Sequence, residues 1–256
     1  MKRIGVLTSG GDTPGMNAAI RAVFKTGVDI DLQVMGIYHG YKGLIEGRVG
    51  YLAHADVESK MHKGGTILRT ARSEEFKTEG GIEKAISVLR AYEIEGLIVI
   101  GGDGSFQGAR ALCEQGIPCI GIPGTIDNDL AYTEMTLGFD TAVNVCVDAV
   151  RSIRATSRSH DRPHVVEVMG RHCGDIALMT AASTGAEIVI APEAKRWTVD
   201  EIAHRLQSQI DRGNYRSTIV VAEGSWEMMA PFDVYKFLKP YGKEVFEGEP
   251  MTAYRF

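Results

Sequence analysis

The sequence predicts an α/β protein in which strands and helices alternate along the whole chain. Short apolar runs, typical of buried parallel strands, are followed by segments whose apolar residues recur at helical spacing. Three of these runs end in glycine-rich turns that carry an acidic residue, at the strand ends where open sheets bind ligands. We therefore expect two doubly wound, Rossmann-like lobes with mainly parallel sheets. The first is residues 1–138, the second is an incomplete lobe at 139–224, and an atypical tail follows at 225–256.

The first lobe is expected to begin with a strand. Strands are predicted at 3–8, 32–37, 96–100 and 118–122, where the chain is short of polar residues. Helices are predicted at 17–26, 79–93 and 105–115. In the second of these helices Ile82, Ala85, Ile86 and Leu89 recur at helical spacing. Residues 39–65 are rich in glycine and are expected to be irregular.

The second lobe continues the alternation. Helices are predicted at 140–157, 175–184 and 199–211, and strands at 165–169, 187–191 and 216–222. Val143, Cys146, Val150 and Ile153 should face inward from the first helix. Thr198 should cap the third helix, because its hydroxyl can accept a hydrogen bond from a first-turn N–H group. From residue 225 onward no convincing period remains.

Composition excludes several classes of function. The net charge of −5 provides no general field for nucleic acid, and no run of about 18 apolar residues predicts a membrane helix. The N-terminus enters a strand at once and lacks a signal-peptide pattern. The four cysteines show no C-x-x-C spacing and are interpreted as reduced thiols. We therefore expect a cytoplasmic enzyme with no membrane or nucleic-acid partner.

The segment GIPGTIDND at 121–129 follows one of the predicted strands. Thr125, Asp127 and Asp129 alternate, so an extended loop would bring their side chains to one side. A hydroxyl and two carboxylates suit a general base, a metal-linked anion and an orienting donor. A plain polar turn is the alternative, since Asp and Asn favour turns.

Two further turns favour the functional interpretation. GGDGS at 101–105 and SGGDTPG at 9–15 each stand between a predicted strand and a predicted helix. In such turns backbone N–H groups point outward and glycine lets phosphate approach closely. Asp103 could hold Mg²⁺ directly or through water. A loop at 64–73 presents Arg69 and Arg72. Together these features predict a nucleotide and a second phosphorylated molecule as ligands.

Four segments, TSGGDTPGMNAAIR, GGDGS, PGTIDND and VVEVMGRHCGD, resemble the ATP-dependent 6-phosphofructokinases of bacteria in order and spacing. The resemblance covers residues 2–224. Members of the family continue with a motif of His, Gln, Arg and two glycines that grips the sugar phosphate, and residues 225–256 contain no such motif. We therefore expect a truncated, frame-shifted or divergent member that binds MgATP, phosphorylates its sugar weakly or not at all, and tends to aggregate.

The resemblance implies transfer of a phosphoryl group from MgATP to the 1-hydroxyl of fructose 6-phosphate, a glycolytic reaction that gives fructose 1,6-bisphosphate and ADP. Asp127 is implied as the general base supported by Thr125 and Asp129, while Arg72 and Arg171 neutralise charge on the transferred group. The residues implied for ATP in the first lobe are Gly11, Arg72, Ser73, Gly102, Asp103, Gly104 and Ser105, with Asp103 serving Mg²⁺. Those implied for the sugar phosphate are Thr125, Ile126, Asp127, Arg162, Met169, Gly170, Arg171 and Glu223, with Arg162 reaching a neighbouring subunit.

The resemblance also implies a homotetramer with an effector site for ADP or phosphoenolpyruvate. The residues implied for this site are Arg21, Lys25, Arg154, Gly185, Glu187 and Arg212. His54 stands where an arginine is common, and the segment at 212–215 lacks an expected lysine, so we expect a weak or altered response. Gly104 and Gly124 stand where pyrophosphate-using relatives carry a larger acidic residue and a lysine, which favours ATP as the donor.

Other classes of protein remain as alternatives. A kinase of the NAD or lipid kinase group shares a glycine-Asp-glycine turn, but the TIDND and MGR segments argue against it. A non-catalytic or impaired nucleotide-binding subunit, or a pyrophosphate-dependent phosphofructokinase, would share most of the motifs. A dehydrogenase is disfavoured because no G-x-G-x-x-G follows a predicted strand.

Overall fold

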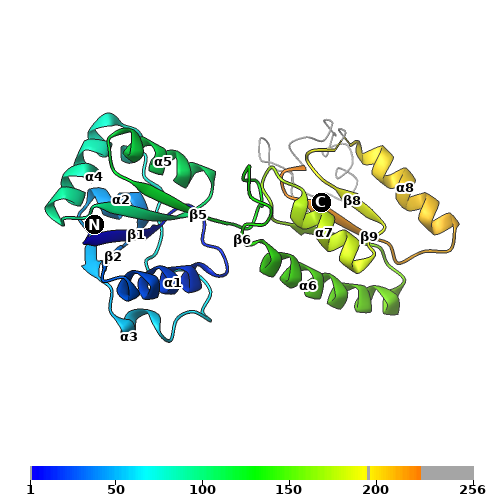
Figure 1. Ribbon diagram of the computed structural model, residues 1–256. Helices are drawn as coiled ribbons and strands as arrows, with labels where there is room; N and C mark the ends of the chain where they lie inside the picture. The colour runs from blue at the N-terminus through cyan, green and yellow to red at the C-terminus, as the bar shows by residue number, and fades with distance from the viewer. Residues whose placement is uncertain (1, 195–196, 226–256) are drawn as a thin grey trace, which may run out of the picture. The chain divides into compact units, whose positions relative to one another are not determined.

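A computed structural model describes residues 2–194 and 197–225 (Figure 1). The chain divides into two compact units, Met1–Asp140 and Thr141–Phe256, which are described separately below. The predicted tail lies outside the described residues from position 226 onward. Within the described part of the chain, no helix combines the length and the apolar character needed to cross a membrane.

The first unit contains a six-stranded sheet in the order β3-β2-β1-β4-β5-β6. The strands are β1 (Arg3–Thr8), β2 (Gln33–Ile37), β3 (Val49–Tyr51), β4 (Gly96–Gly101), β5 (Cys119–Thr125) and β6 (Leu137–Gly138). Neighbouring strands are parallel except for the antiparallel pair β2 and β3. From β1 the chain moves outward to β2 and then crosses back to β4 on the other side. The strand order therefore reverses between β1 and β4, which is where doubly wound sheets bind ligands.

Helices cover both faces of this sheet (Figure 1). They are α1 (Met16–Asp29), α2 (Gly40–Ile45), α3 (His54–Val57), α4 (Glu79–Ala91) and α5 (Asp103–Glu114), with a 3₁₀ turn, η1 (Glu75–Lys77), before α4. One core cluster joins Leu7 and Leu97 of the sheet to Leu89 of α4, and another joins Val6 to Phe24 of α1. Because successive residues of a strand point to opposite faces, Val6 and Leu7 enter different clusters. The predicted doubly wound architecture is confirmed for this unit.

The prediction of an irregular segment at 39–65 is wrong. The structure places α2, β3 and α3 there, with lengths of six, three and four residues. Such short elements give too few repeats for a periodic pattern to be visible in the sequence. They are held instead by tertiary packing, because Leu44, Leu52 and Val57 are buried in the two core clusters.

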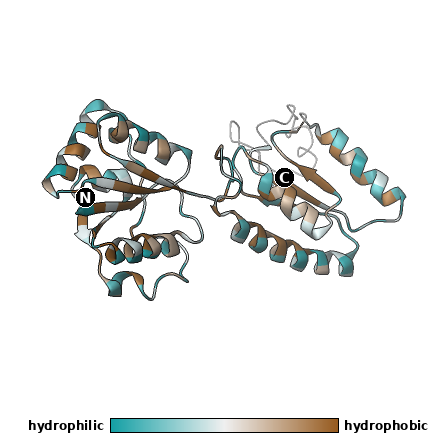
Figure 2. Cartoon of the chain, viewed as in Figure 1, coloured by the Kyte–Doolittle hydropathy of each residue, from teal (hydrophilic) through white to brown (hydrophobic). Residues whose placement is uncertain are grey.

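The second unit is built on a three-stranded parallel sheet in the order β7-β9-β8. Its strands are β7 (His164–Val168), β8 (Ile188–Ile190) and β9 (Thr218–Ala222), and its helices are α6 (Phe139–His160), α7 (Asp175–Thr184) and α8 (Val199–Asp211). Figure 2 shows the strands in brown, the colour of hydrophobic residues. Ile190, Trp197, Ile219 and Val221 form a core cluster with Ile188.

The cap predicted for α8 is confirmed. The amide of Glu201 donates to the hydroxyl oxygen of Thr198 at 3.1 Å, and the carboxylate of Glu201 accepts from the amide of Thr198 at 3.0 Å. This reciprocal capping box satisfies two backbone donors at the start of the helix. The inward face predicted for α6 is confirmed at Val143 and Val150, which are buried, while Cys146 and Ile153 are half-buried.

Candidate active site

Three of the predicted motifs meet at one edge of the first sheet, because β1, β4 and β5 are parallel neighbours. The amide of Ser9 donates to the carbonyl oxygen of Ile100 at 3.0 Å, which joins the turn after β1 to the end of β4. Gly101 pairs with Pro123 across β4 and β5. The carboxyl ends of the three strands therefore present their turns side by side, at the point where the strand order reverses.

Glycine is required at position 101 because the turns pack closely. A Cβ atom on Gly101 would lie 2.5 Å from the carbonyl oxygen of Ser9 and would also collide with the Ser105 hydroxyl. By contrast, a Cβ on Gly11 or Gly104 would have no neighbour within 4 Å. These two glycines therefore face open space rather than packed protein. The sequence has glycine at one position for close packing and at the others for access.

The N-terminus of α5 supplies backbone hydrogen-bond donors where these turns meet. Gly102 is the N-cap, with extended backbone and no side-chain cap. In the part of the chain that the structure describes, the amides of Asp103 and Gly104 have no acceptor. Unpaired amides at the start of a helix of 12 residues, with glycine on both sides of Asp103, suit an anion such as phosphate. We call Gly11 and residues 102–104 the glycine cradle.

Ser105 is placed differently from the rest of the predicted nucleotide residues. Its side chain is 3% exposed, so the hydroxyl belongs to the interior of the turn rather than to its surface. The carbonyl oxygen of Ser105 accepts a hydrogen bond of 2.6 Å from the hydroxyl of Tyr41 in α2. Burial raises the pKa of Tyr41 well above its ordinary value, so the tyrosine remains a donor. The sequence did not mark Tyr41 as functional. Through the Ser105 carbonyl it holds the first turn of α5, which carries the cradle.

The loop at 69–73 is fastened to the same edge. The hydroxyl of Thr70 donates to the carbonyl oxygen of Gly10 at 2.6 Å, and that of Thr8 donates to the carbonyl oxygen of Arg69 at 3.0 Å. The side chain of Arg72 is exposed. The hydroxyl of Ser73 accepts a hydrogen bond of 3.2 Å from the backbone amide of Phe76. The loop is thus fastened at Arg69 and Thr70 to β1 and the turn after it, while Ser73 orders the start of η1.

Asp103 is the first residue of α5, and its side chain is exposed. Its carboxylate accepts a hydrogen bond of 2.6 Å from the side-chain Nε2 of Gln107, one turn along the helix. Among the described residues, no three His, Cys, Asp or Glu side chains cluster in a way that would hold a metal by themselves. A single carboxylate still fits Mg²⁺, which is held in nucleotide sites by one or two carboxylates, by phosphate oxygens and by water.

The segment after β5 is not the extended loop that the sequence predicted. β5 runs to Thr125, the chain bends at Ile126 and Asp127, and Asn128 has a left-handed backbone with φ of 57°. The amide of Asp127 donates to the Thr125 hydroxyl at 3.2 Å. The prediction that an extended loop brings Thr125, Asp127 and Asp129 to one side is therefore wrong. Asp127 is half-buried and Asp129 is exposed.

Two residues that hold this bend were missed as functional residues. The hydroxyl of Thr136 donates to the carbonyl oxygen of Thr125 at 2.7 Å, and the amide of Thr136 donates to the side-chain oxygen of Asn128 at 2.9 Å. Asn tolerates the left-handed conformation better than most residues, so Asn128 between two aspartates was a usable signal. Thr136 carries no signal of its own in the sequence.

In the second unit, the predicted sugar-phosphate residues gather at the carboxyl ends of β7 and β9, where Val168 pairs with Ala222. The carboxylate of Glu223 accepts a hydrogen bond of 2.9 Å from the backbone amide of Arg171. Gly170 and Arg171 both have positive φ values, 138° and 48°, which turn the chain sharply after β7. Met169 and the Arg171 side chain remain exposed. The structure thus brings Met169, Gly170, Arg171 and Glu223 together.

Arg162 lies apart from these residues within the second unit. It stands two positions before the start of β7, whereas Met169 follows the end of the strand. The two positions therefore lie at opposite ends of β7. The Arg162 side chain is exposed, and its carbonyl oxygen accepts a hydrogen bond from the buried hydroxyl of Ser157.

The residues predicted for an effector form one cluster in each unit. In the second unit Arg154 donates to the carbonyl oxygen of Gly185 at 3.1 Å and pairs with Glu187 at 3.3 Å, and Asn214 donates to Glu187 at 3.2 Å. Arg212 is the exposed C-cap of α8.

In the first unit Arg21 and Lys25 both pair with Glu58, at 3.5 and 3.4 Å. The hydrogen bond from Lys25 and the nearby positive charges lower the pKa of Glu58, so this carboxylate stays ionised. The sequence did not mark Glu58. The carboxylate carries the same charge as an anionic effector, and such a ligand has to displace it or share its two cations.

Comparison with known proteins shows what this chain is similar to. The family model for phosphofructokinase matches residues 3–247. ATP-dependent 6-phosphofructokinases from Alkaliphilus metalliredigens and Bacillus cytotoxicus are each 56% identical to it over 224 residues, which cover 88% of this chain and 70% of each relative. The solved phosphofructokinase of Saccharomyces cerevisiae matches 94% of the chain with a TM-score of 0.82 and 37% identity, and the chain spans 37% of that protein's chain. On both sequence and structure, the chain belongs to the phosphofructokinase family.

Proposed function

We propose that this chain transfers the γ-phosphoryl group of MgATP to the 1-hydroxyl group of fructose 6-phosphate. The observation that carries the proposal is the adjacency of the glycine cradle to the bend that holds Asp127. A Cβ atom on Gly102 would lie 3.6 Å from the Cβ of Thr125, whose hydroxyl fixes the Asp127 amide. Relatives that are 56% identical are named ATP-dependent 6-phosphofructokinases, which supports the same activity here.

The two glycines at 104 and 124 support ATP rather than pyrophosphate as the donor. A side chain at position 104 would project into open space beside the cradle, where a nucleotide needs room for its α-phosphate. Gly124 is buried, and a Cβ there would lie 3.2 Å from a side-chain carbon of Ile100. Glycine at position 104 therefore leaves open the space that ATP would occupy, and position 124, which is packed against Ile100, lacks the lysine of pyrophosphate-using relatives.

In the proposed reaction Asp127 accepts the proton of the 1-hydroxyl group as its oxygen attacks the γ-phosphorus. The bond to the β-phosphate oxygen breaks, and ADP leaves. The hydrogen bond from the Asp127 amide to Thr125 limits the positions that the carboxylate can take. Amides of the glycine cradle, with Arg72, are the donors that the first unit is proposed to supply to the phosphoryl oxygens. When bound, Mg²⁺ would be held by Asp103 and would offset phosphate charge.

Two measurements on the purified chain test the proposal. Binding of MgATP is measured by calorimetry, and turnover is measured by coupling the formation of fructose 1,6-bisphosphate to oxidation of NADH, a readout that does not depend on the donor. The proposal expects saturable MgATP binding and sugar-dependent turnover with ATP, with no turnover when pyrophosphate replaces ATP. Binding of MgATP without turnover would instead support a non-catalytic nucleotide-binding subunit, and activity with pyrophosphate would overturn the assignment of the donor.

We also propose an effector site and a contact with a neighbouring subunit. The cluster of Arg154, Glu187 and Asn214 and that of Arg21, Lys25 and Glu58 each contain cations suited to an anionic effector such as ADP or phosphoenolpyruvate. The exposed position of Arg162, apart from the other sugar-phosphate residues, agrees with a role toward a neighbouring subunit of a homotetramer. A cytoplasmic location follows from the same proposal.

A further inference from the structure

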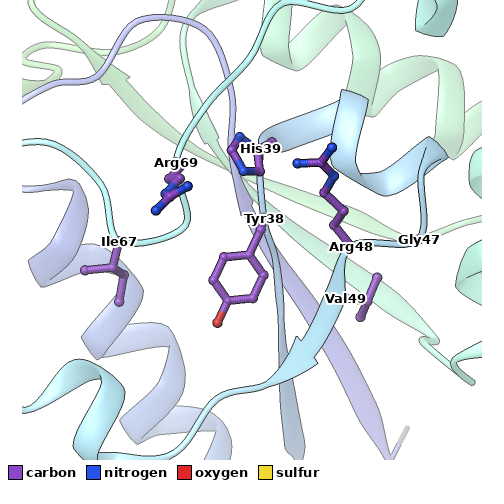
Figure 3. Close-up of a pocket in the computed structure, with 7 residues that line it drawn as sticks. All are labelled: Tyr38, His39, Gly47, Arg48, Val49, Ile67 and Arg69. Atoms are coloured by element: carbon purple, nitrogen blue, oxygen red, sulfur yellow. The ribbon is translucent and has the colours of Figure 1, made fainter.

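The first unit contains a cavity of about 420 Å³ that is lined by none of the residues implied for ATP, for the sugar phosphate or for the effector. It lies at the carboxyl end of β2 and is lined by Tyr38, His39, Gly47, Arg48, Val49, Ile67 and Arg69 (Figure 3). We propose that this cavity binds a small phosphate monoester whose body is aromatic or otherwise apolar. The site would be separate from the glycine cradle and would take a different molecule from the one proposed there.

The charges of the lining favour an anion. Arg48, Arg69 and His39 contribute nitrogen donors, and no carboxylate is among the lining residues. Figure 3 shows the imidazole of His39 between the side chains of the two arginines. Within the described ranges the Arg69 guanidinium has no ion-pair partner, so its fork of donors is available.

Arg48 is only partly committed to another group. Its Nε atom pairs with the carboxylate of Glu46 at 2.6 Å, which leaves its two terminal nitrogens for a ligand. Two forked guanidinium groups on one cavity match the several oxygens of a phosphate better than the single charge of a lysine would.

The other side of the cavity is apolar. The ring of Tyr38 and the aliphatic side chains of Val49 and Ile67 complete the lining. A volume of about 420 Å³ is within the range of small-molecule sites, in which a few polar groups fix the orientation of a largely apolar contact. A bare inorganic anion would leave this apolar wall in contact with water. A phosphate ester with an apolar body would contact both sides of the cavity.

The backbone holds the cationic residues in unusual positions. His39 and Arg69 both have left-handed conformations, with φ of 66° and 59°, although neither is glycine. The amide of His39 donates to the carbonyl oxygen of Leu68 at 2.8 Å, and the Arg69 carbonyl accepts from Thr8 at 3.0 Å. Such conformations persist where neighbouring contacts impose them, and they are concentrated at ligand sites. Here they place both side chains on one cavity before any ligand arrives.

Calorimetric titration of the full chain with phenyl phosphate tests the proposal, with inorganic phosphate as the comparison. The wild type should bind phenyl phosphate more tightly than inorganic phosphate. Arg69→Gln and Arg48→Gln should each lower the affinity roughly tenfold or more, because each removes a charge-assisted hydrogen bond. Arg69→Lys keeps the charge and should lose part of the affinity, because the forked donor is lost. Tyr38→Leu should reduce the preference for the phenyl ester.

Two control variants locate the binding. Arg110→Gln removes an exposed arginine of α5 that pairs with Glu114, and it should leave the affinity within about twofold if binding is specific. Arg72→Gln alters the loop beside the glycine cradle and should also leave phenyl phosphate binding intact. If Arg72→Gln removes binding while Arg69→Gln does not, the ester occupies the cradle and the proposal is wrong. Equal losses in Arg110→Gln and Arg69→Gln, or no binding by the wild type at millimolar concentration, would overturn it as well.

Discussion

The hydroxyl group of Thr136 donates a hydrogen bond of 2.7 Å to the carbonyl oxygen of Thr125, the last residue of β5. The amide of Thr136 holds Asn128 at the same time, so one buried residue fixes both ends of the bend that contains Asp127. The proposed general base is therefore placed by a residue nine positions further along the chain. This arrangement leads to the first prediction.

Replacing Thr136 by valine should lower kcat without changing the affinity for MgATP. The substitution keeps the shape of the side chain but leaves the Thr125 carbonyl without its donor, which costs roughly 1–3 kcal/mol where the group is buried. Steady-state kinetics and urea unfolding measure the two effects. Thr26→Val, on the exposed surface of α1, is the matched control and should change neither. An unaltered kcat in the Thr136 variant would show that the bend does not need this hydrogen bond.

Asp127→Ser should reduce turnover by roughly 10²–10⁴-fold, because general-base catalysis acts in the transition state. The affinity for MgATP should stay nearly the same, since Asp127 is not part of the glycine cradle. Asp29→Ser, at the exposed end of α1, serves as the control for loss of one negative charge. A variant at position 127 with near-normal kcat would refute the assignment of the base.

Gly104→Asp should weaken MgATP binding far more than sugar-phosphate binding, because the new carboxylate would repel the nucleotide phosphates. The chain contains a close control in Gly80→Asp. Both glycines are the second residue of a helix, both are exposed, and a Cβ on either has no neighbour within 4 Å. Folding should tolerate both changes, and only Gly104→Asp should affect titration with MgATP. Equal affinities in the two variants would mean that residues 102–104 do not contact the nucleotide.

The cysteines of the first unit should differ in reactivity. Burial, followed by the neighbouring Cys113, raises the pKa of Cys119 to about 12, whereas Cys113 is exposed. A raised thiol pKa leaves little reactive thiolate at neutral pH, so iodoacetamide should label Cys113 first and Cys119 only after unfolding. Mass spectrometry of the labelled peptides measures the order. The same pKa predicts that folding stability falls as pH rises from about 9 toward 12, because the unfolded thiol ionises more readily than the folded one. Rapid labelling of Cys119 in the native protein would contradict the burial.

The sequence by itself determined the elements whose pattern is local. β1 and α7 were predicted with the bounds that the structure has, Arg3–Thr8 and Asp175–Thr184, because a short apolar run and a longer apolar stretch are each visible within one segment. The three glycine turns were also evident, since tight turns and open phosphate sites both select glycine. From the alternation of these elements a doubly wound fold follows.

Only the tertiary structure decided the features that depend on distant partners. The left-handed Asn128 is held by Thr136, the loop of Arg72 is held by Gly10, and α2 is packed through Tyr41 against α5. The cavity of Arg48 and Arg69 forms where the end of β2 meets residues about 30 positions further along the chain. A local pattern records which face of an element is apolar, but it does not record which distant carbonyl or hydroxyl completes a hydrogen bond. That choice is made when the strands pair and their turns are brought to the same edge of the sheet.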